Sequence, residues 1–510
     1  MSKSQQVDSH WDVIVIGSGL GGLSAATRLS QSGLRVLVLE QHEFSGGYAH
    51  HFLRKVRGTK IVYDFDVALH QTGDLAPGRQ MNRLLNSMGV LEQLKVNRFD
   101  IAYRTRGPAH DLQIPADADD YEALLCDSYP EHAGGVRDLF QALREIDAPG
   151  PDGGMSPTAL ATLNLSLQDF MDQHVRDERI QAIFATLWGY LGLLPSEASA
   201  FLYTRLWSSY HFGGCFYFQG GGQALADTFV NLIEANRGRV LLRTAVTGIG
   251  THGGRICSVE TKKRGTFHAP VVVSNASAPQ TFHDLLDDPG LASADLERVD
   301  GLPIACSIHQ AYVGIRGDAA KIGMPDRGAF FNHSYDWSDE AEGLATSDYS
   351  KQGWLTGNHN IADPGHPPPG RSILHAAVLA RGDQWMDLDE TEYREKKREI
   401  EEHLIDKLAL AIPDIRERIE ICEVGTPRTM MRYSWNPQGS IYGYASTPTS
   451  HSIHRPDART SVPGLYLAGS WTFPSAGFTG TMLSGYRTAG LIFEDHEGSR
   501  PDPQRIRDPG

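Results

Sequence analysis

The sequence contains little cysteine. Its 510 residues include only five cysteines, and no two of them form a C-x-x-C pair. Structural zinc sites and iron–sulfur clusters are usually held by closely spaced cysteines, so this spacing argues against both. No metal site is predicted. We read the odd number of cysteines, together with the absence of a secretory signal, as indicating a reducing compartment.

Long apolar runs are also lacking. No stretch of about eighteen apolar residues occurs, so no membrane-spanning helix is predicted. Residues 1–10 are polar, which argues against a secretory signal. We therefore expect a cytoplasmic protein, and leave open a peripheral contact with a membrane surface.

Positive charge is scarce as well. The formal net charge is −15, and the densest basic stretches, 262–264 and 394–398, are short. Binding to a polyanion would need a basic stripe, so no nucleic-acid partner is predicted. The content of 40% hydrophobic and 21% charged residues is that of a globular protein and excludes global disorder.

Glycine, in contrast, is abundant and clustered. Residues 11–16 form a continuous apolar run that predicts a buried strand, and Gly17-Ser18-Gly19-Leu20-Gly21-Gly22 follows it directly. Apolar residues at helical spacing continue to residue 31, and 35–40 predicts a second strand that ends in Glu40. This βαβ pattern with G-x-G-x-x-G predicts a dinucleotide site on a parallel sheet, with Glu40 on the ribose hydroxyls. A carboxylate there would repel the 2′-phosphate of NADP.

Two further glycine features favour FAD over NAD. The pair Gly46-Gly47 follows Glu40 and would let the chain pass close to a pyrophosphate and a flavin. Far along the chain, residues 464–469 predict a strand, and a helix from about Gly480 to Phe493 would direct its N–H groups at the flavin ring. Nucleotide motifs at both ends of the chain suit one elongated cofactor, which FAD is.

The sequence resembles the FAD-dependent phytoene desaturase, carotenoid isomerase and retinol saturase family of amine-oxidase-like flavoproteins. The segments that carry the resemblance are spread along most of the chain, namely 15–48, 217–222, 271–276, 425–429, 439–443 and 464–485. The last is the most specific, because Thr472-Phe473-Pro474, Gly477, Gly480 and Ser484-Gly485 fit the T-F-P-x-x-G-x-x-G-x-x-x-S-G pattern of the saturases and isomerases.

The resemblance implies an α/β fold in which a discontinuous Rossmann-like FAD-binding domain, glutathione-reductase-like and of the amine-oxidase type, is interleaved with an α+β substrate-binding domain. We expect residues 8–78, 211–281 and 440–495 in the first domain and 79–210 and 282–439 in the second. Residues 496–510 are expected to form a flexible tail.

The resemblance also implies a set of cofactor contacts. The predicted cofactor-binding residues are Gly17, Ser18, Gly19, Leu20, Gly21, Gly22, Glu40, Gln41, Gly46, Gly47, Tyr48, Val246, Asn275, Gly469, Ser470, Gly480, Thr481 and Met482. This chain departs from the family at Tyr48, where an arginine is common, and at Ser470, where an acid is frequent. The last helix has no cysteine, so FAD is expected to be bound non-covalently.

Three polar residues are candidates for catalysis. Retinol saturases have an F-D-x-G-x-H pattern that resembles residues 65–70, which implies that Asp66 and His70 lie near the flavin. Histidine titrates near neutrality and can both give and take a proton. Tyr442 is a third candidate. The apolar, aromatic stretches 184–194, 201–218 and 330–331 are candidates for a hydrophobic substrate channel.

These features predict an FAD-dependent oxidoreductase that saturates or desaturates a carbon–carbon bond of an apolar, polyene-like substrate by hydride transfer with flavin N5. A redox-neutral double-bond isomerase, an amine or amino-acid oxidase and a non-catalytic FAD-binding escort protein are the alternatives. The predicted binding partner is thus a hydrophobic small-molecule substrate. The sequence does not identify the electron donor or acceptor, because no second G-x-G-x-x-G of similar quality is present for NADPH.

Overall fold

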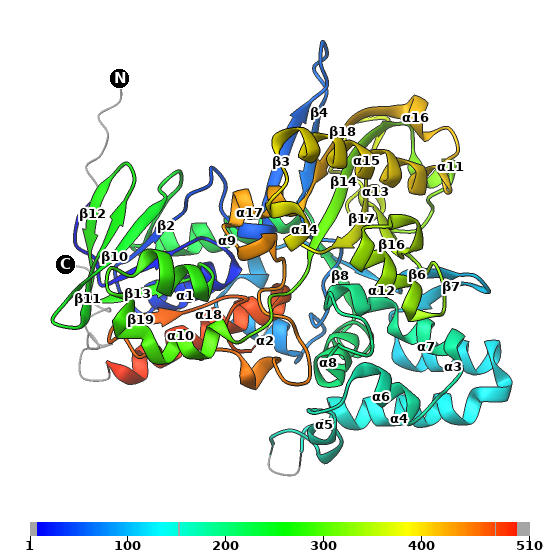
Figure 1. Cartoon of the computed structure of the whole chain (residues 1–510), viewed down its shortest axis with the longest axis horizontal. Helices are drawn as coiled ribbons and strands as arrows, with labels where there is room; N and C mark the ends of the chain where they lie inside the picture. The colour runs from blue at the N-terminus through cyan, green and yellow to red at the C-terminus, as the bar shows by residue number, and fades with distance from the viewer. Residues whose placement is uncertain (1–7, 151–152, 475, 497–510) are drawn as a thin grey trace.

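The computed structural model describes residues 8–150, 153–474 and 476–496, so the predicted tail lies almost entirely outside the described residues. Its elements form two groups around two different sheets. Figure 1 shows a parallel sheet with its helices on the left, a larger mixed sheet at the upper right, and a helical layer below that sheet. No helix in the described part of the chain combines the length and the apolar character needed to cross a bilayer.

The parallel sheet has five strands in the order β19-β13-β1-β2-β9. Their bounds are β1 Val13–Ile16, β2 Val36–Leu39, β9 Arg239–Leu241, β13 Val271–Ser274 and β19 Leu465–Leu467. Strand β1 lies between β2 and β13, with Val13 opposite both Val36 and Val271. The predicted βαβ unit and the strand near the end of the chain are therefore parts of one sheet.

Both faces of this sheet are covered, which explains why its strands are continuous apolar runs. On one face, Val13 and Val15 of β1 pack in a core with helices α1 Leu20–Gln31, α9 Gly221–Ala235 and α18 Gly477–Asp495. On the other face, Ile14 and Ile16 pack against a three-stranded antiparallel sheet. The strands of that smaller sheet are β10 Val246–His252, β11 Arg255–Thr261 and β12 Gly265–His268.

The mixed sheet has seven strands in the order β18-β14-β17-β16-β15-β6-β7. Their bounds are β6 Ile101–Gly107, β7 His110–Pro115, β14 Ser307–Arg316, β15 Gly328–Phe331, β16 Trp354–Asn358, β17 Arg371–Ala380 and β18 Ile419–Gly425. The long helix α15, Glu390–Ala409, packs on the sheet through Ile400, Leu404 and Leu408. It begins with a capping box in which Asp389 and Glu392 bind each other's backbone N–H groups.

The helical layer shares one apolar core around Tyr121, Phe140 and Trp207. Its longer helices are α3 Ala118–Ser128, α4 Ala133–Asp147 and α8 Ala200–His211, and its shorter ones are α5 Pro157–Ala161, α6 Leu167–Asp172 and α7 Glu178–Phe184. The remaining helices are α2 Gln80–Ser87, α10 Ser293–Asp300, α11 Ala319–Ile322, α12 Trp337–Thr346, α13 His359–Ala362, α14 Asp383–Met386, α16 Ile415–Arg418 and α17 Pro427–Ser434.

Two small sheets link the groups. In the hairpin of β3 His51–Lys55 and β4 Val62–Asp66, Tyr63 and Phe65 pack against Tyr312 of β14. Strand β5 Val96–Phe99 pairs with β8 Cys215–Phe218. The five parallel strands all fall in segments predicted for the cofactor domain, and the seven mixed strands in segments predicted for the substrate domain. The exact domain boundaries stay a prediction.

Candidate functional site

The turn between β1 and α1 is folded too tightly for side chains. Gly17 has a positive φ of 87°, and a Cβ atom on Gly22 would overlap the carbonyl oxygen of Gly17. A Cβ atom on Gly19 would lie 2.6 Å from Asn275 Nδ2. Helix α1 has Gly19 at its N-cap, no side chain capping it and no acidic residue in its first turn. Its first N–H groups and its dipole thus fit a phosphate.

The carboxylate of Glu40 lies beside this turn and is only 8% exposed. Its Oε2 accepts hydrogen bonds from Ser18 N (2.8 Å) and Ser18 Oγ (2.7 Å), and its Oε1 accepts one from His42 N (2.8 Å). A carboxylate has about four acceptor positions, so one remains for a further donor such as a ribose hydroxyl. The structure therefore orients Glu40 firmly and leaves it able to bind such a hydroxyl.

The second glycine segment runs against the first. Gly46 N donates to Ser18 O (2.9 Å), and Gly46 and Gly47 have positive φ values of 117° and 60°. A Cβ atom on Gly47 would lie 3.0 Å from the Cα atom of Gly19. Next to the pair, burial raises the pKa of Tyr48, whose hydroxyl donates to Ser440 O (3.3 Å). The two segments thus line one side of the same groove.

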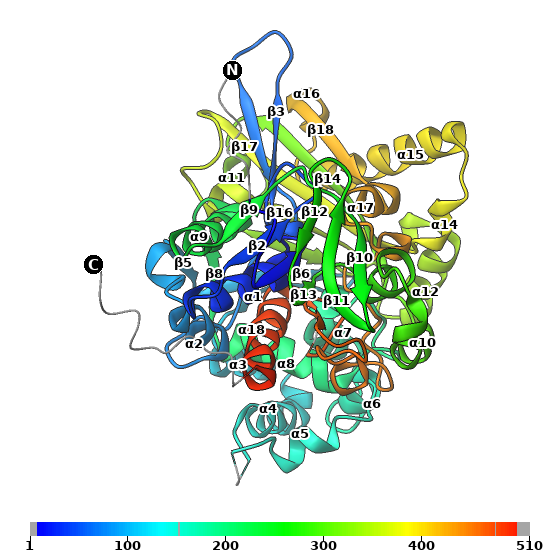
Figure 2. The same ribbon diagram turned by 90° about the vertical axis from the view of Figure 1, so that its left-hand side faces the viewer.

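The last strand and last helix of the chain meet this groove from the other side. Figure 2 shows α18 beside α1, and a Cβ atom on Gly485 would overlap the carbonyl oxygen of Gly21. Ser24 Oγ also donates to Met482 O (2.8 Å). Helices α1 and α18, which come from opposite ends of the described chain, are therefore in direct contact. Helix α18 begins at Gly477, one turn earlier than the start near Gly480 that the sequence predicts.

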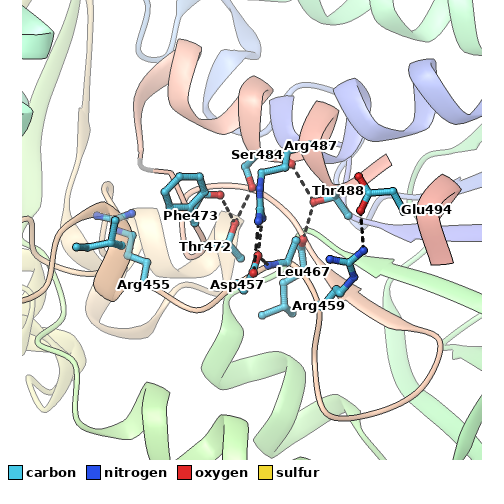
Figure 3. A network of polar contacts seen from close by, with 12 residues as sticks. Arg455, Asp457, Arg459, Leu467, Thr472, Phe473, Ser484, Arg487, Thr488 and Glu494 are labelled. Carbon is cyan, nitrogen blue, oxygen red and sulfur yellow. Dashed lines mark hydrogen bonds and ion pairs between the residues drawn. The ribbon is translucent and has the colours of Figure 1, made fainter. Parts of the chain in front are cut away.

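A polar network holds the turn between β19 and α18 (Figure 3). Ser484 Oγ accepts from Gly469 N (3.0 Å) and is 2.6 Å from Thr472 Oγ1, while Thr488 Oγ1 donates to Leu467 O (2.9 Å). The guanidinium of the buried Arg455 donates to the carbonyl of Ser470. These contacts fix the backbone of residues 469–472 where it meets the first glycine turn.

One main cavity of about 1510 Å³ connects these segments with the apolar region beside the mixed sheet. It exceeds the usual volume of a single ligand site, so it has room for an elongated cofactor and a substrate. The predicted cofactor residues that line it are Gly17, Gly19, Leu20, Gly21, Glu40, Gln41, Gly46, Gly47, Tyr48, Val246, Asn275, Ser470, Gly480 and Thr481. Ser18, Gly22, Gly469 and Met482 lie behind this lining and support it through the contacts described above.

The far part of the main cavity has aromatic and aliphatic walls. The predicted apolar stretches contribute Trp188, Tyr190, Leu191, Phe201, Leu202, Leu206, Tyr210, Phe330 and Phe331. Phe184 does not reach the cavity, because it is fully buried in the helical core against Tyr203 and Trp207. Such walls suit a ligand with few polar groups.

His70 lines the main cavity and stacks on His375, with ring centroids 4.0 Å apart. Burial lowers the pKa of His70 to about 4, and its Nε2 atom has no hydrogen-bond partner in the structure. The ring is therefore neutral at pH 7. A buried, unpaired ring nitrogen beside a cavity is available to a ligand.

The other two catalytic candidates are placed differently. The carboxylate of Asp66 is not among the groups that line the main cavity, and it accepts from the backbone N–H groups of Gly222 (2.6 Å), Leu69 (2.7 Å) and Ala68 (3.0 Å). Burial raises its pKa to about 6. Tyr442 lines the cavity and donates to Gly189 O (3.2 Å). The geometry gives Asp66 a structural function at the start of α9, while the catalytic assignments remain predictions.

Some residues near His70 have no counterpart in the sequence prediction. His375 comes from β17, and its Nδ1 atom shares a hydrogen bond with His359 Nε2 (3.0 Å). Arg327 lies just before β15. They are far from His70 in sequence and belong to no short motif. His375 is a polar residue within an otherwise apolar strand, and His359 and Arg327 lie outside the strands, so the sequence around them does not indicate a partner.

Comparisons with known proteins agree with this geometry. The sequence profile of the family described as flavin containing amine oxidoreductase matches residues 20–493. All-trans-retinol 13,14-reductase of Danio rerio is 25% identical over 542 aligned residues, which cover 96% of this chain and 87% of that protein. Prolycopene isomerase 2, chloroplastic, of an Oncidium hybrid cultivar is 24% identical over 514 residues, covering 95% and 84%.

The fold has solved counterparts as well. The crystal structure of an oxidoreductase from Methanosarcina mazei superposes with a TM-score of 0.65 at 18% identity, covering 95% of this chain and all of that one. The predicted family and fold class are thereby confirmed. The chain belongs to the flavin-containing amine oxidoreductase family.

Proposed function

We propose that the protein binds FAD non-covalently and saturates or desaturates a carbon–carbon bond of an apolar, polyene-like substrate. The observation that carries the proposal is the main cavity, which runs without interruption from the glycine turns and Glu40 to the aromatic walls near Tyr190 and Phe330. The residues around the turns fit a dinucleotide, because the backbone leaves no room for side chains and Glu40 keeps a free acceptor position. A family of flavoproteins with retinol reductase and carotenoid isomerase relatives supports the choice of substrate class.

The roles of the chain's own groups follow from their positions. Bound FAD would supply hydride acceptance or donation at its N5 atom. The N–H groups at the start of α1 would hold the pyrophosphate, Glu40 would bind the ribose, and the aromatic walls would exclude water from an apolar substrate. Since the ring of His70 is neutral at pH 7, we assign it a hydrogen-bonding and positioning role at Nε2 rather than proton donation as an imidazolium.

A redox-neutral isomerase is the second candidate, because a prolycopene isomerase matches almost as well as a retinol reductase. An isomerase would use the same cavity without net electron transfer. An amine oxidase is the third candidate, and it would be reduced by amines and release peroxide.

An anaerobic titration separates these functions. The flavin spectrum of the purified holoenzyme is recorded with a conjugated polyene, and that of the dithionite-reduced holoenzyme with the same compound. Bleaching of oxidised flavin would indicate desaturation, reoxidation of reduced flavin would indicate saturation, and a shifted polyene with unchanged flavin would indicate isomerisation. A colourless protein that cannot be reconstituted with FAD would refute the proposal at its base.

A further inference from the structure

A second, small cavity adjoins the main cavity behind His70, and we call it the side cavity. Its volume is about 20 Å³, enough for roughly one water-sized group. Its lining residues are His70, Gln71, Tyr103, Tyr190, Arg327, Gly328, Phe330, Leu355, Thr356 and His375. Several of these, among them His70, Gln71 and Tyr190, also line the main cavity. The two cavities are therefore adjacent and share part of their walls, and the side cavity has room for one oxygen atom of a ligand.

Arg327 brings a positive charge to the side cavity without a matching negative charge. The side chain is only 9% exposed, and no carboxylate is paired with it among the described residues. Its Nη2 donates to Gln71 Oε1 (2.7 Å) and Ala102 O (2.5 Å), and its Nη1 donates to His70 O (3.4 Å). The guanidinium also lies over the ring of Phe99, 4.4 Å from its centroid, while Nε has no partner. Burial lowers the pKa of Arg327. A buried charge is usually paired with an opposite charge, whereas the partners of Arg327 among the described residues are neutral carbonyl and amide oxygens and an aromatic ring.

Two neighbouring side chains share this lack of partners. Gln71 uses its Oε1 to accept from Arg327, and its Nε2 is left without an acceptor. The Nε2 atom of His70 is also unpaired. Arginine Nε and glutamine Nε2 are donors only, and a neutral histidine can donate at Nε2. The unsatisfied groups around the side cavity therefore need an acceptor, and the positive guanidinium, whose Nε is unpaired, favours one that is negatively charged.

We propose that the side cavity takes one oxygen of the carboxylate at the end of an elongated apolar substrate, and that Arg327 and Gln71 recognise this carboxylate. This inference deepens the proposed function, on which it rests, by naming the substrate class as an apolar acid whose hydrocarbon body lies in the main cavity. A pure hydrocarbon would leave the unpaired nitrogens Arg327 Nε, Gln71 Nε2 and His70 Nε2 without an acceptor, whereas a carboxylate supplies an acceptor and a negative charge together.

The test compares two compounds that differ only at the end group. Parinaric acid, a conjugated tetraene fatty acid, and its methyl ester are titrated into the holoenzyme, and binding is followed by polyene fluorescence without any turnover. We expect the acid to bind at least about 10-fold more tightly than the ester, because charge-assisted hydrogen bonds are lost in the ester. Equal affinities would overturn this inference and leave the proposed function standing. Binding of neither compound would overturn both.

Three variants locate the effect. Arg327→Met keeps most of the side-chain volume and should reduce the acid-to-ester preference to about 1. Gln71→Glu supplies the missing carboxylate from the chain itself, so it should weaken binding of the acid and not of the ester. Arg205→Met is the matched control, because Arg205 also lines the main cavity but is exposed. A preference that survives Arg327→Met, or that disappears in Arg205→Met, would contradict the assignment. If Arg327→Met does not fold, the Gln71→Glu variant and the wild-type comparison still decide the question.

Discussion

Replacing Glu40 by glutamine tests the cofactor site with little change in shape. In the native structure both carboxylate oxygens accept backbone or hydroxyl hydrogen bonds, and one acceptor position remains for a ribose hydroxyl. Glutamine keeps one acceptor oxygen and turns the other into a donor. A hydrogen bond to a charged group contributes about 1.5–3 kcal/mol, so we expect the dissociation constant for FAD to rise about 10-fold to 100-fold.

In Glu40→Gln the new amide NH2 group faces a backbone N–H group, that of either Ser18 or His42. Because two donors then oppose each other, the apoprotein should also unfold at a lower temperature. Affinity is therefore measured on folded apoprotein, by quenching of flavin fluorescence, with the melting temperature recorded in parallel. Glu43→Gln is the control, because Glu43 lines the same cavity but is half-exposed and paired with Arg243. An unchanged FAD affinity in Glu40→Gln, or an equal loss in Glu43→Gln, would refute the ribose assignment.

Three further predictions concern other parts of the molecule. Gly485→Ala should lower the free energy of unfolding by about 2–3 kcal/mol, because the added Cβ atom would overlap the backbone of Gly21. Gly490→Ala should have a smaller effect, because its Cβ atom meets only the end of the Arg28 side chain at 2.9 Å, where it would disturb the hydrogen bond from Arg28 to Tyr486 O. Equal chemical denaturation curves for the two variants would contradict the close contact of α1 and α18. His70→Ala should keep bound flavin but slow turnover at least about 10-fold, with partial recovery in His70→Gln, and a normal rate would remove His70 from the mechanism. The hydrogen bond to Asp64 raises the pKa of His51, so the stability from this pair is present below the unfolded pKa of histidine and is lost as pH rises through the higher folded pKa. The free energy of unfolding of wild type should exceed that of His51→Gln by about 1 kcal/mol at pH 5.5 and by less at pH 8.5. A larger difference at pH 8.5 would show that the sign is wrong.

The cofactor half of the fold was predictable because its signals are local. The apolar runs around Val13 and Val36 are buried on both faces, and the glycine turn between them is needed for backbone contact. The closing segment was predictable for the same reason, although α18 begins at Gly477 and not at Gly480. Helix ends are set by capping geometry, which sequence patterns locate only to within a turn.

The mixed sheet and the residues near His70 were much less predictable. Strands β6 and β15 pair in parallel although they are far apart in the sequence, and no short motif indicates this pairing. The mixed sheet brings His375 and Arg327 beside His70, and neither His375 nor Arg327 belongs to a motif that would single it out in the sequence. Asp66 is a different case: a motif marks it as a catalytic candidate, and the structure shows its oxygens accepting backbone N–H groups, so its catalytic assignment stays a prediction.

The groove for the cofactor and the cavity proposed for the substrate differ in which residues can change without loss of the fold. The groove for the cofactor is made of backbone atoms, so a side chain added at Gly19 or Gly22 displaces the chain itself. The side cavity is lined by side chains on separate elements, and exchanging Arg327 for an apolar residue of similar volume removes a charge from it without altering a turn. We therefore expect substrate choice within this family to vary with such isolated positions, while the glycine turns stay in place. On this view the end group that a family member accepts depends on whether a buried donor such as Arg327 faces its cavity, more than on the overall similarity of the chains.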